Sequence, residues 1–173
     1  KEIILSAGYE VRQSGFEDNY REIKNKFISN PNESLQRLKS NPDLEITDPE
    51  TGEFYRIEVK TTTRSNENYQ IAVSDAVKYR KYHGDAYLLI YHIPTASFWT
   101  QKIDDIEWES LALIEQSGEQ FYHLDFFHFR QLEDLFSKVT KGIVEDRKHL
   151  IKELFRQYFI GLEFEKHVDA DSF

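Results

Sequence analysis

The stretch Asn41–Lys60, NPDLEITDPETGEFYRIEVK, decides the fold. Two segments of alternating polar and apolar residues, 43–47 and 54–60, flank a turn-forming centre. Pro49 suits the early position of a type I turn, and Gly52 can adopt the left-handed conformation that closes a short loop. The sequence therefore predicts a β-hairpin whose four-residue loop runs from Pro49 to Gly52.

The pairing of this hairpin follows from its loop, because the numbers of any two facing residues then sum to 101. One surface of the hairpin is apolar and contains Leu44, Ile57, Ile46 and Tyr55. On the other surface, Glu45 faces Arg56, which is a favourable pair of opposite charges. The hairpin should therefore bury one face and expose the other.

Two acids face each other on the polar surface. Asp43 is opposite Glu58, and Lys60 lies two residues beyond Glu58 on the same side. Opposed carboxylates destabilise a ladder by roughly 0.2–1 kcal/mol, but a divalent cation such as Mg²⁺ reverses the sign because it binds carboxylate oxygens. A neighbouring lysine can stabilise charge developing on a phosphate or orient the attacking water. This pattern indicates metal-assisted hydrolysis of a phosphodiester; its alternative is an ordinary solvated hairpin face.

Pro42-Asp43, followed after a short hairpin by Glu58-Val59-Lys60, resembles the signature of the PD-(D/E)XK nucleases. These are the restriction-endonuclease-like and Holliday-junction-resolvase-like enzymes. The resemblance implies that Asp43 and Glu58 bind Mg²⁺, for which Mn²⁺ should substitute. It also implies that the backbone carbonyl of Val59 is a further metal ligand and that Lys60 assists the nucleophilic water.

The resemblance covers about residues 1–99 and implies an α/β (α+β) fold, with a restriction-endonuclease-like core in which helices flank a mixed central β-sheet. Before the hairpin, the chain should contain a helix that ends at Gly8, a strand over Tyr9–Gln13, and helices over Phe16–Ser29 and Asn32–Leu38. After the hairpin, we expect a polar loop over Arg64–Asn68 and then a helix over Ser74–His83, with Ser74 as its cap and Gly84 as its terminator. Strands over Ala86–Ile93 and Ser97–Lys102 should follow. The later part should contain a second hairpin formed by Leu111–Glu115 and Phe121–Phe129, a helix over Arg130–Lys141, and an apolar helical stripe between Ile143 and Leu162. His92 is expected to be a hydrogen-bonded core histidine.

We expect a nuclease-like core over residues 1–104, with an inserted helical segment at about 16–40. Residues 105–173, with the second hairpin and a helical C-terminal extension, should pack on this core or mediate dimerisation. The chain begins with Lys1 and contains no methionine, so we expect that its first residues are missing or that it is an excised domain.

Four further residues are candidates for supporting the metal site. Glu2 lies where the family often has a supporting glutamate on its first helix, and Glu22 lies on the inserted helix. Glu45 and Gln70 lie near the motif in sequence. The alternative for the two helical glutamates is a surface acid, and for Gln70 a loop residue.

Composition limits the function. The chain has no cysteine, which excludes disulfides, cysteine-based zinc sites and iron–sulfur clusters. The longest clear apolar run, Ala86–Tyr91, is too short to cross a bilayer, and no signal-peptide pattern is present. We therefore expect a cytoplasmic protein that does not engage a membrane.

The net charge of −9 counts against a passive coat on nucleic acid, although local basic patches matter more than the sum. Candidate DNA contacts are Arg64, Lys78, Arg80 and Lys81, with a solvated helix face as the alternative for the last three. The sequence thus predicts a Mg²⁺-dependent DNA endonuclease, of restriction, repair or junction type, with DNA preferred over RNA and a homodimer as one arrangement. The alternative is a non-catalytic binding or interaction module of the same fold within a larger protein.

Overall fold

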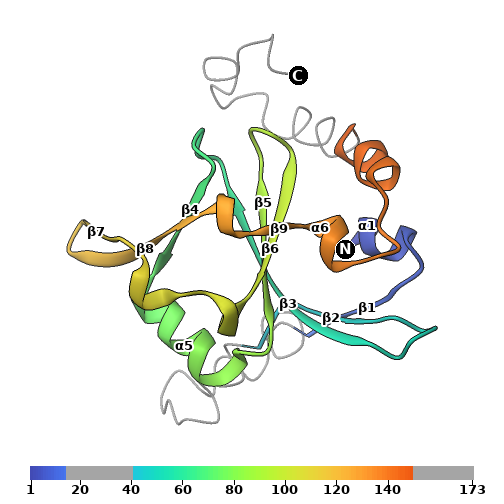
Figure 1. The fold of residues 1–173 in the computed structure, drawn as a ribbon, viewed down its shortest axis with the longest axis horizontal. Coiled ribbons are helices and arrows are strands. Elements are labelled where there is room, and N and C mark those ends of the chain that lie inside the picture. The colour runs from blue at the N-terminus through green and yellow to red at the C-terminus, as the bar shows by residue number, and fades with distance from the viewer. Residues whose placement is uncertain (15–40, 150–173) are drawn as a thin grey trace, which may run out of the picture.

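The computed structural model describes residues 1–14 and 41–149 and contains two β-sheets (Figure 1). The main sheet has the strand order β1-β2-β3-β5-β6-β9, and the second sheet has the order β4-β8-β7. Within the main sheet, β3 and β5 run parallel and the other neighbours are antiparallel. The predicted mixed central sheet with flanking helices is therefore confirmed.

The strands of the main sheet are β1 (Glu10–Gln13), β2 (Leu44–Thr47), β3 (Phe54–Thr62), β5 (Tyr87–His92), β6 (Ser97–Lys102) and β9 (Arg130–Gln131). The strands of the second sheet are β4 (Asn68–Ala72), β7 (Leu113–Gln116) and β8 (Glu119–Asp125). The α-helices are α1 (Glu2–Ser6), α5 (Val73–His83) and α6 (Leu132–Leu135), and residues 141–149 are also helical. Within the described ranges, no helix combines the length and the apolar character that a bilayer crossing requires.

The β2–β3 hairpin has the predicted register, with Leu44 opposite Ile57. Its loop is closed by Gly52, which has a φ of 75° and whose N–H donates to the carbonyl of Asp48 at 2.8 Å. The N–H of Asp48 in turn donates to the carbonyl of Glu53 at 2.9 Å. The positive φ explains the glycine, because residues with a Cβ rarely adopt this conformation.

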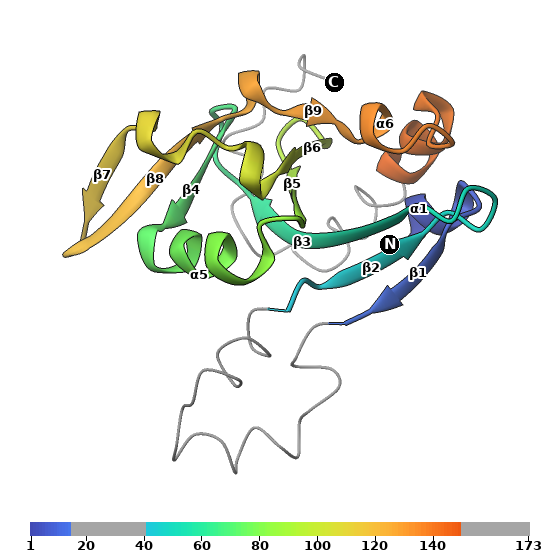
Figure 2. The same ribbon diagram turned by 60° about the horizontal axis from the view of Figure 1, so that its bottom comes forward.

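Alternate side chains of β3 enter two separate cores. Ile57 is fully buried in a core shared with α1 and α6, which we call the α1 side. Glu58 points the opposite way and meets Tyr79 of α5, on what we call the α5 side. Figure 2 shows the second sheet with α5 at one end of the molecule and α1 with α6 at the other. The predicted polar surface of the hairpin therefore belongs to the α5 side.

Strand β5 is buried on both faces, as its near-continuous apolar sequence predicts. Leu88 and Ile90 belong to the core of the α5 side, and Leu89 belongs to that of the α1 side. His92, at the end of the strand, is fully buried, and its Nδ1 and Nε2 atoms lie 2.6 Å from Thr95 Oγ1 and 2.8 Å from the Arg64 carbonyl. The expectation of a hydrogen-bonded core histidine is confirmed.

The predicted ends of α5 need correction. The helix begins at Val73, and its first turn has no side-chain cap, so Ser74 is not the capping residue. The helix does end at Gly84, but this glycine has a right-handed φ of −58°. A Cβ at this position would overlap the carboxylate of Asp104. Gly84 therefore does not form the left-handed turn that was predicted, and the Asp104 side chain packs directly over it.

Strand β4 was not predicted, and the interpretation of Gln70 as a loop residue is wrong. Gln70 lies within β4, opposite His123 of β8. The five residues of β4 lead directly into α5, and their pairing partner lies some fifty positions further along the chain. A short strand with a distant partner gives no local signal beyond weak alternation.

The predicted helix over Arg130–Lys141 is wrong over most of its length. Its first two residues form β9, which pairs with the edge of β6, and α6 then occupies only Leu132–Leu135. Leu132, Phe136 and Val139 have helical spacing and are buried on the α1 side. Phe136 and Val139 lie after the end of α6, in a segment that is not helical. The start of the predicted helix, Arg130–Gln131, is instead a strand paired with β6.

The predicted second hairpin is present as β7–β8, with Ser117 and Gly118 at φ values of 56° and 80°. Two consecutive positive φ angles are typical of the type I′ turn that suits a tight hairpin. Because β8 pairs with β4, residues on either side of position 104 share one sheet. The inserted segment at 16–40 and most of the C-terminal stripe lie outside the described residues, and the division at 104 stays a prediction.

Lys138 fixes the loop of the β2–β3 hairpin from a distant part of the chain. Its Nζ atom lies 2.7 Å from Asp48 Oδ1 and 2.9 Å from Glu50 Oε2. The hydrogen bond from Lys138 lowers the pKa of Asp48 and, reciprocally, the bond to Asp48 raises the pKa of Lys138. Phe136 packs nearby, with its ring centroid 5.0 Å from that of Tyr55. The segment after α6 therefore clamps the hairpin.

We expect Lys138→Met to lower the melting temperature at pH 7 more than Lys148→Met, which removes an i,i+3 pair with Glu145 of 2.7 Å on the 141–149 helix. Because the folded state lowers the pKa of Asp48, this ion pair stabilises the protein fully at pH values above the pKa of Asp48 in the unfolded chain, which is near 3.8. Its contribution is lost as the pH falls through the folded pKa. Thermal melts from pH 7 to pH 2 should show the Lys138→Met deficit shrinking with acid; a deficit independent of pH would contradict this account.

Candidate active site

The β2–β3 ladder is interrupted at Pro42. Facing residues of an antiparallel ladder alternate between hydrogen-bonded and non-hydrogen-bonded pairs. Because Asp48 and Glu53 form a hydrogen-bonded pair, a regular ladder would make Pro42 and Val59 a hydrogen-bonded pair as well. Proline has no N–H, and the Pro42 carbonyl instead accepts a hydrogen bond from Ser14 Oγ at 2.6 Å. The N–H of Val59 donates to Asp43 Oδ2 at 2.8 Å. The Asp43 side chain thus replaces the missing backbone acceptor.

The same interruption affects the Val59 carbonyl. In a β-strand, the N–H and C=O of one residue point to the same edge, so the Val59 carbonyl also points toward position 42. A regular ladder would supply it with an N–H there, and Pro42 has none. This carbonyl is therefore presented to whatever lies beside Asp43.

Asp43 and Glu58 come together on the α5 side. Continuing the β2–β3 register by one step places them opposite each other as a non-hydrogen-bonded pair, the type in which side chains lie closest. Glu58 is only 7% exposed. Burial raises the pKa of Glu58, the nearby Lys60 opposes that shift, and repulsion from the Asp43 carboxylate adds to it. The two acids therefore interact through space.

Lys60 and Tyr79 both hold the same oxygen of Glu58. Lys60 Nζ lies 2.6 Å from Glu58 Oε1, and the Tyr79 hydroxyl donates to this atom at 2.7 Å. Lys60 Nζ also lies 5.7 Å from the centroid of the Tyr79 ring. Burial favours the neutral amine of Lys60, but the Glu58 carboxylate outweighs it and raises the lysine pKa. Lys60 is therefore held as an ammonium.

Tyr79 is the site residue that the sequence interpretation missed. Its pKa is raised by burial and by the adjacent Glu58 carboxylate, so it is a hydrogen-bond donor at neutral pH. A signal for it exists: Ala76, Tyr79 and His83 are the buried residues of α5 and follow helical spacing. This spacing marks the helix face that packs against β3, although it does not identify a tyrosine as the partner of an acid.

The donor atoms of this site fit a hard divalent cation. Among the described residues, hydrogen bonds and ion pairs are recorded for Asp43 Oδ2 and Glu58 Oε1, which leaves the second oxygen of each carboxylate for a ligand. The described part of the chain contains no group of three or more His, Cys, Asp or Glu side chains arranged for a metal. Mg²⁺ needs no such group, because it is commonly held by one or two carboxylates and several waters.

Two of the supporting acids predicted from the sequence, Glu2 and Glu45, lie in the part of the chain that the structure describes. Glu2 is exposed on α1, which packs on the α1 side of the sheet, opposite the face that carries Glu58. Glu45 is paired with Arg56 across the ladder, as predicted. Glu22 lies outside the described residues. The structure therefore joins Asp43, Glu58, Val59 and Lys60, and it does not bring Glu2 or Glu45 into contact with them.

The predicted basic residues are exposed, and two of them are paired with acids. Lys78 lies 2.9 Å from Asp75, and Arg80 lies 2.7 Å from Glu109. Lys81 Nζ lies 4.8 Å from the Tyr82 ring centroid. Arg64 donates a hydrogen bond to Gln70 Oε1, which brings together two of the predicted residues.

Comparisons with known proteins give limited similarity. No family model matches the chain, and a search of curated proteins finds no relative. Among solved structures, the chain is similar to the Holliday junction resolvase Hjc of Archaeoglobus fulgidus, with 14% identity and a TM-score of 0.44 over 80% of this chain and 89% of that one. It is also similar to a nuclease from a fusselovirus, with 12% identity and a TM-score of 0.43 over 80% of each chain.

The geometry around Glu58 predicts the sign of three pKa changes. Lys60→Met and Tyr79→Phe should each raise the pKa of Glu58, because each removes a group that stabilises the carboxylate. Asp43→Asn should lower it, because the repulsion disappears. Carboxyl-carbon NMR titration of the metal-free protein measures all three. A lowered Glu58 pKa in Tyr79→Phe would show that the hydroxyl does not donate to the carboxylate.

Proposed function

We propose that this protein is a metal-dependent endonuclease that hydrolyses phosphodiester bonds of DNA. The observation that carries the proposal is the meeting of Asp43 and Glu58 at the interrupted end of the β2–β3 ladder, with Lys60 on the same face. Two like charges, of which Glu58 is buried, are retained there at a cost to the ladder, which a bound cation would offset. A buried carboxylate with a raised pKa, held on a sheet strand as Glu58 is, is a candidate for catalysis.

Mg²⁺ would be held by the free oxygens of Asp43 and Glu58 and by the Val59 carbonyl, with water completing its shell. Such an ion supplies Lewis-acid stabilisation of a phosphate and lowers the pKa of a bound water. Tyr79 fixes the Glu58 carboxylate by occupying Oε1. The Val59 N–H fixes the Asp43 carboxylate in the same way through Oδ2. Both acids are thus oriented before any ligand arrives.

Lys60 would act through its charge. Because Glu58 raises its pKa, the amine stays protonated at neutral pH and has no lone pair with which to accept a proton. It can donate a hydrogen bond to the attacking water or to a phosphate oxygen, where it stabilises the charge that develops as the phosphorus–oxygen bond breaks. We therefore assign Lys60 the role of an electrostatic and orienting residue rather than a general base.

The second candidate is a non-catalytic binding module of the same fold. The net charge of −9 and the ion pairs of Lys78 and Arg80 favour it, because they reduce the positive surface available to a DNA backbone. A module of this kind would bind DNA or a protein partner without metal-dependent cutting. The two candidates therefore differ in the product formed from DNA when metal is present.

Metal binding is tested first. Mg²⁺ or Mn²⁺ should raise the melting temperature of the wild type. At a free metal concentration one hundred times Kd, the free energy of unfolding should increase by about 2.7 kcal/mol. Asp43→Asn can still accept the Val59 N–H through its amide oxygen but loses the charge, so we expect it to melt no lower than wild type without metal and to gain little from metal. Calorimetric titration gives Kd directly. Equal metal stabilisation in both proteins would exclude Asp43 as a ligand.

Cleavage is tested second. The purified protein should nick or cut plasmid DNA with Mg²⁺ or Mn²⁺, and Asp43→Ala, Glu58→Ala and Lys60→Ala should each lower the rate by roughly a hundredfold or more. Glu45→Ala is the matched control, because Glu45 lies on the same hairpin outside the acid pair. Retention of wild-type cleavage by all three variants would exclude this site as the source of activity. DNA binding with no cleavage under any metal would favour the binding module.

A further inference from the structure

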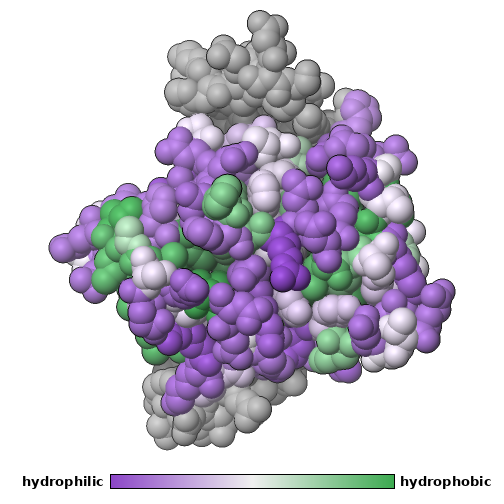
Figure 3. All heavy atoms as spheres, in the orientation of Figure 1, coloured by the Kyte–Doolittle hydropathy of each residue, from purple (hydrophilic) through white to green (hydrophobic). Residues whose placement is uncertain are grey.

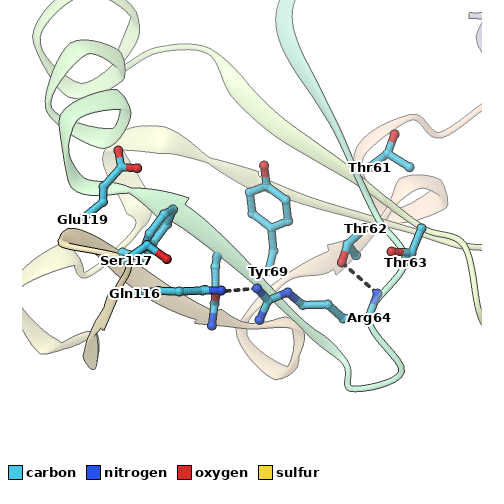
Figure 4. Close-up of a pocket in the computed structure, with 10 residues that line it drawn as sticks. Thr61, Thr62, Thr63, Arg64, Tyr69, Gln116, Ser117 and Glu119 are labelled. Atoms are coloured by element: carbon cyan, nitrogen blue, oxygen red, sulfur yellow. Dashed lines mark hydrogen bonds between the residues drawn. The ribbon is translucent and has the colours of Figure 1, made fainter.

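A polar groove lies beside the acid pair, between the end of β3 and the β7–β8 hairpin (Figure 4). Its volume is about 460 Å³. One wall consists of Thr61–Arg64, and the other includes Ser117 and Glu119 of the hairpin. Figure 4 shows Tyr69 of β4 standing between these walls. The face of the molecule drawn in Figure 3 is largely hydrophilic, with apolar side chains gathered toward its left and right sides.

The groove is continuous with the candidate active site. Strand β3 carries Glu58 and Lys60 and then runs directly into Thr61 and Thr62 of the groove wall. Successive residues of a strand rise by about 3.3 Å, so the backbone of Thr62 lies roughly 7 Å beyond that of Lys60. The charges of Lys60 and Glu58 both act on the Tyr69 hydroxyl, whose pKa is raised mainly by burial. A polymeric substrate bound at Asp43 and Glu58 would therefore extend into this groove.

Arg64 is held in place at the groove by three separate hydrogen bonds. Its N–H donates to Thr62 Oγ1 at 3.3 Å, and its carbonyl lies 2.8 Å from Nε2 of the fully buried His92. Its guanidinium donates to Gln70 Oε1. An exposed arginine usually loses considerable side-chain entropy when it binds a ligand. The hydrogen bond to Gln70 already restricts the Arg64 side chain, so less entropy remains to be lost on binding.

Among residues 1–14 and 41–149, the partner of the Arg64 guanidinium carries no charge. Arg56 and Arg80 are paired with Asp85 and Glu109, whereas the partner of Arg64 is the neutral amide of Gln70. In the parts of the chain that the structure describes, no carboxylate lies within ion-pair distance of Arg64. An oriented guanidinium with unused donors suits a phosphate oxygen.

The size and lining of the groove select one kind of occupant. A volume of about 460 Å³ is that of a small-ligand pocket and cannot contain both strands of a duplex. The hydroxyl and amide groups of Thr61, Thr63 and Gln116 can donate to phosphate or sugar oxygens. The ring of Tyr69 offers a surface on which a base can stack.

We propose that this groove binds a single strand of DNA that continues from the reaction site, with Arg64 on a backbone phosphate and Tyr69 against a base. This inference rests on the proposed function for its choice of DNA. It adds that the substrate has an unpaired segment next to the bond that is cut, and that Gln70 acts as a positioning residue by holding the Arg64 guanidinium.

Binding of fluorescein-labelled oligothymidine of about twelve nucleotides, measured by fluorescence anisotropy in EDTA, tests the groove without any cleavage. Arg64→Gln should weaken binding by about five- to tenfold and reduce the slope of log K against log salt by about 0.7, the value for one single-strand phosphate. Arg64→Lys should retain the slope because it retains the charge. Tyr69→Leu should weaken binding by roughly tenfold with the slope unchanged.

Arg147→Gln is the matched control, because Arg147 contacts Ser6 of α1 on the opposite side of the sheet. It should bind oligothymidine as the wild type does. Circular dichroism melts of each variant identify any that fail to fold, and the exposed Arg64 decides the test if Tyr69→Leu is such a variant. Wild-type affinity and salt slope in Arg64→Gln would overturn the proposal, as would failure of the wild type to bind oligothymidine.

Failure of the groove proposal and failure of the proposed nuclease function give different results. Loss of oligothymidine binding in Arg64→Gln, in a protein whose wild type never cuts DNA, would support the groove and reject the nuclease. Normal oligothymidine binding in Arg64→Gln, in a protein whose wild type does cut DNA, would reject the groove and leave the nuclease. Tighter binding of a blunt duplex than of oligothymidine, with Arg64→Gln weakening only the duplex, would also overturn the single-strand assignment.

Discussion

The hydrogen bond from the Val59 N–H to the Asp43 carboxylate is the contact on which the candidate site depends. The Pro42 carbonyl, which would accept this N–H in a regular ladder, accepts from Ser14 Oγ instead, so that the Asp43 side chain takes its place. This exchange of acceptors orients Asp43 and brings it beside Glu58. The Val59 carbonyl faces the space next to the two carboxylates. The proline and the aspartate act as a unit, which gives a physical reason for their adjacency.

Around this contact, residues 1–14 and 41–149 supply hydrogen-bond and ion-pair partners to one oxygen of each acid. Tyr79 and Lys60 hold one oxygen of Glu58, and a backbone amide holds one oxygen of Asp43. Burial raises the pKa of Glu58, so its ionisation opposes folding at neutral pH in the absence of a counter-charge. Groups that destabilise the protein while being carefully oriented are expected where function, rather than stability, has determined the sequence.

The sequence predicted the features that depend on local patterns. The register of the β2–β3 hairpin, the buried strand β5, the β7–β8 hairpin and the face shared by the two acids all follow from alternation and turn residues. It failed where pairing partners are distant: β4 needs β8, and β9 takes the edge of β6 in place of a helix. The Tyr79–Glu58 contact was missed for the same reason, since it joins a helix to a strand whose packing no local pattern specifies.

The clamp that Lys138 places on the hairpin loop has a consequence for how the chain matures. The hairpin leaves the ribosome about ninety residues before its clamp, as the separation of Asp48 and Lys138 shows. Strand β4 likewise waits for β8, and β6 waits for β9. Contacts of such long range are slow to form. In a nascent chain, the β2–β3 hairpin therefore lacks its contact with Lys138 until that residue has been synthesised.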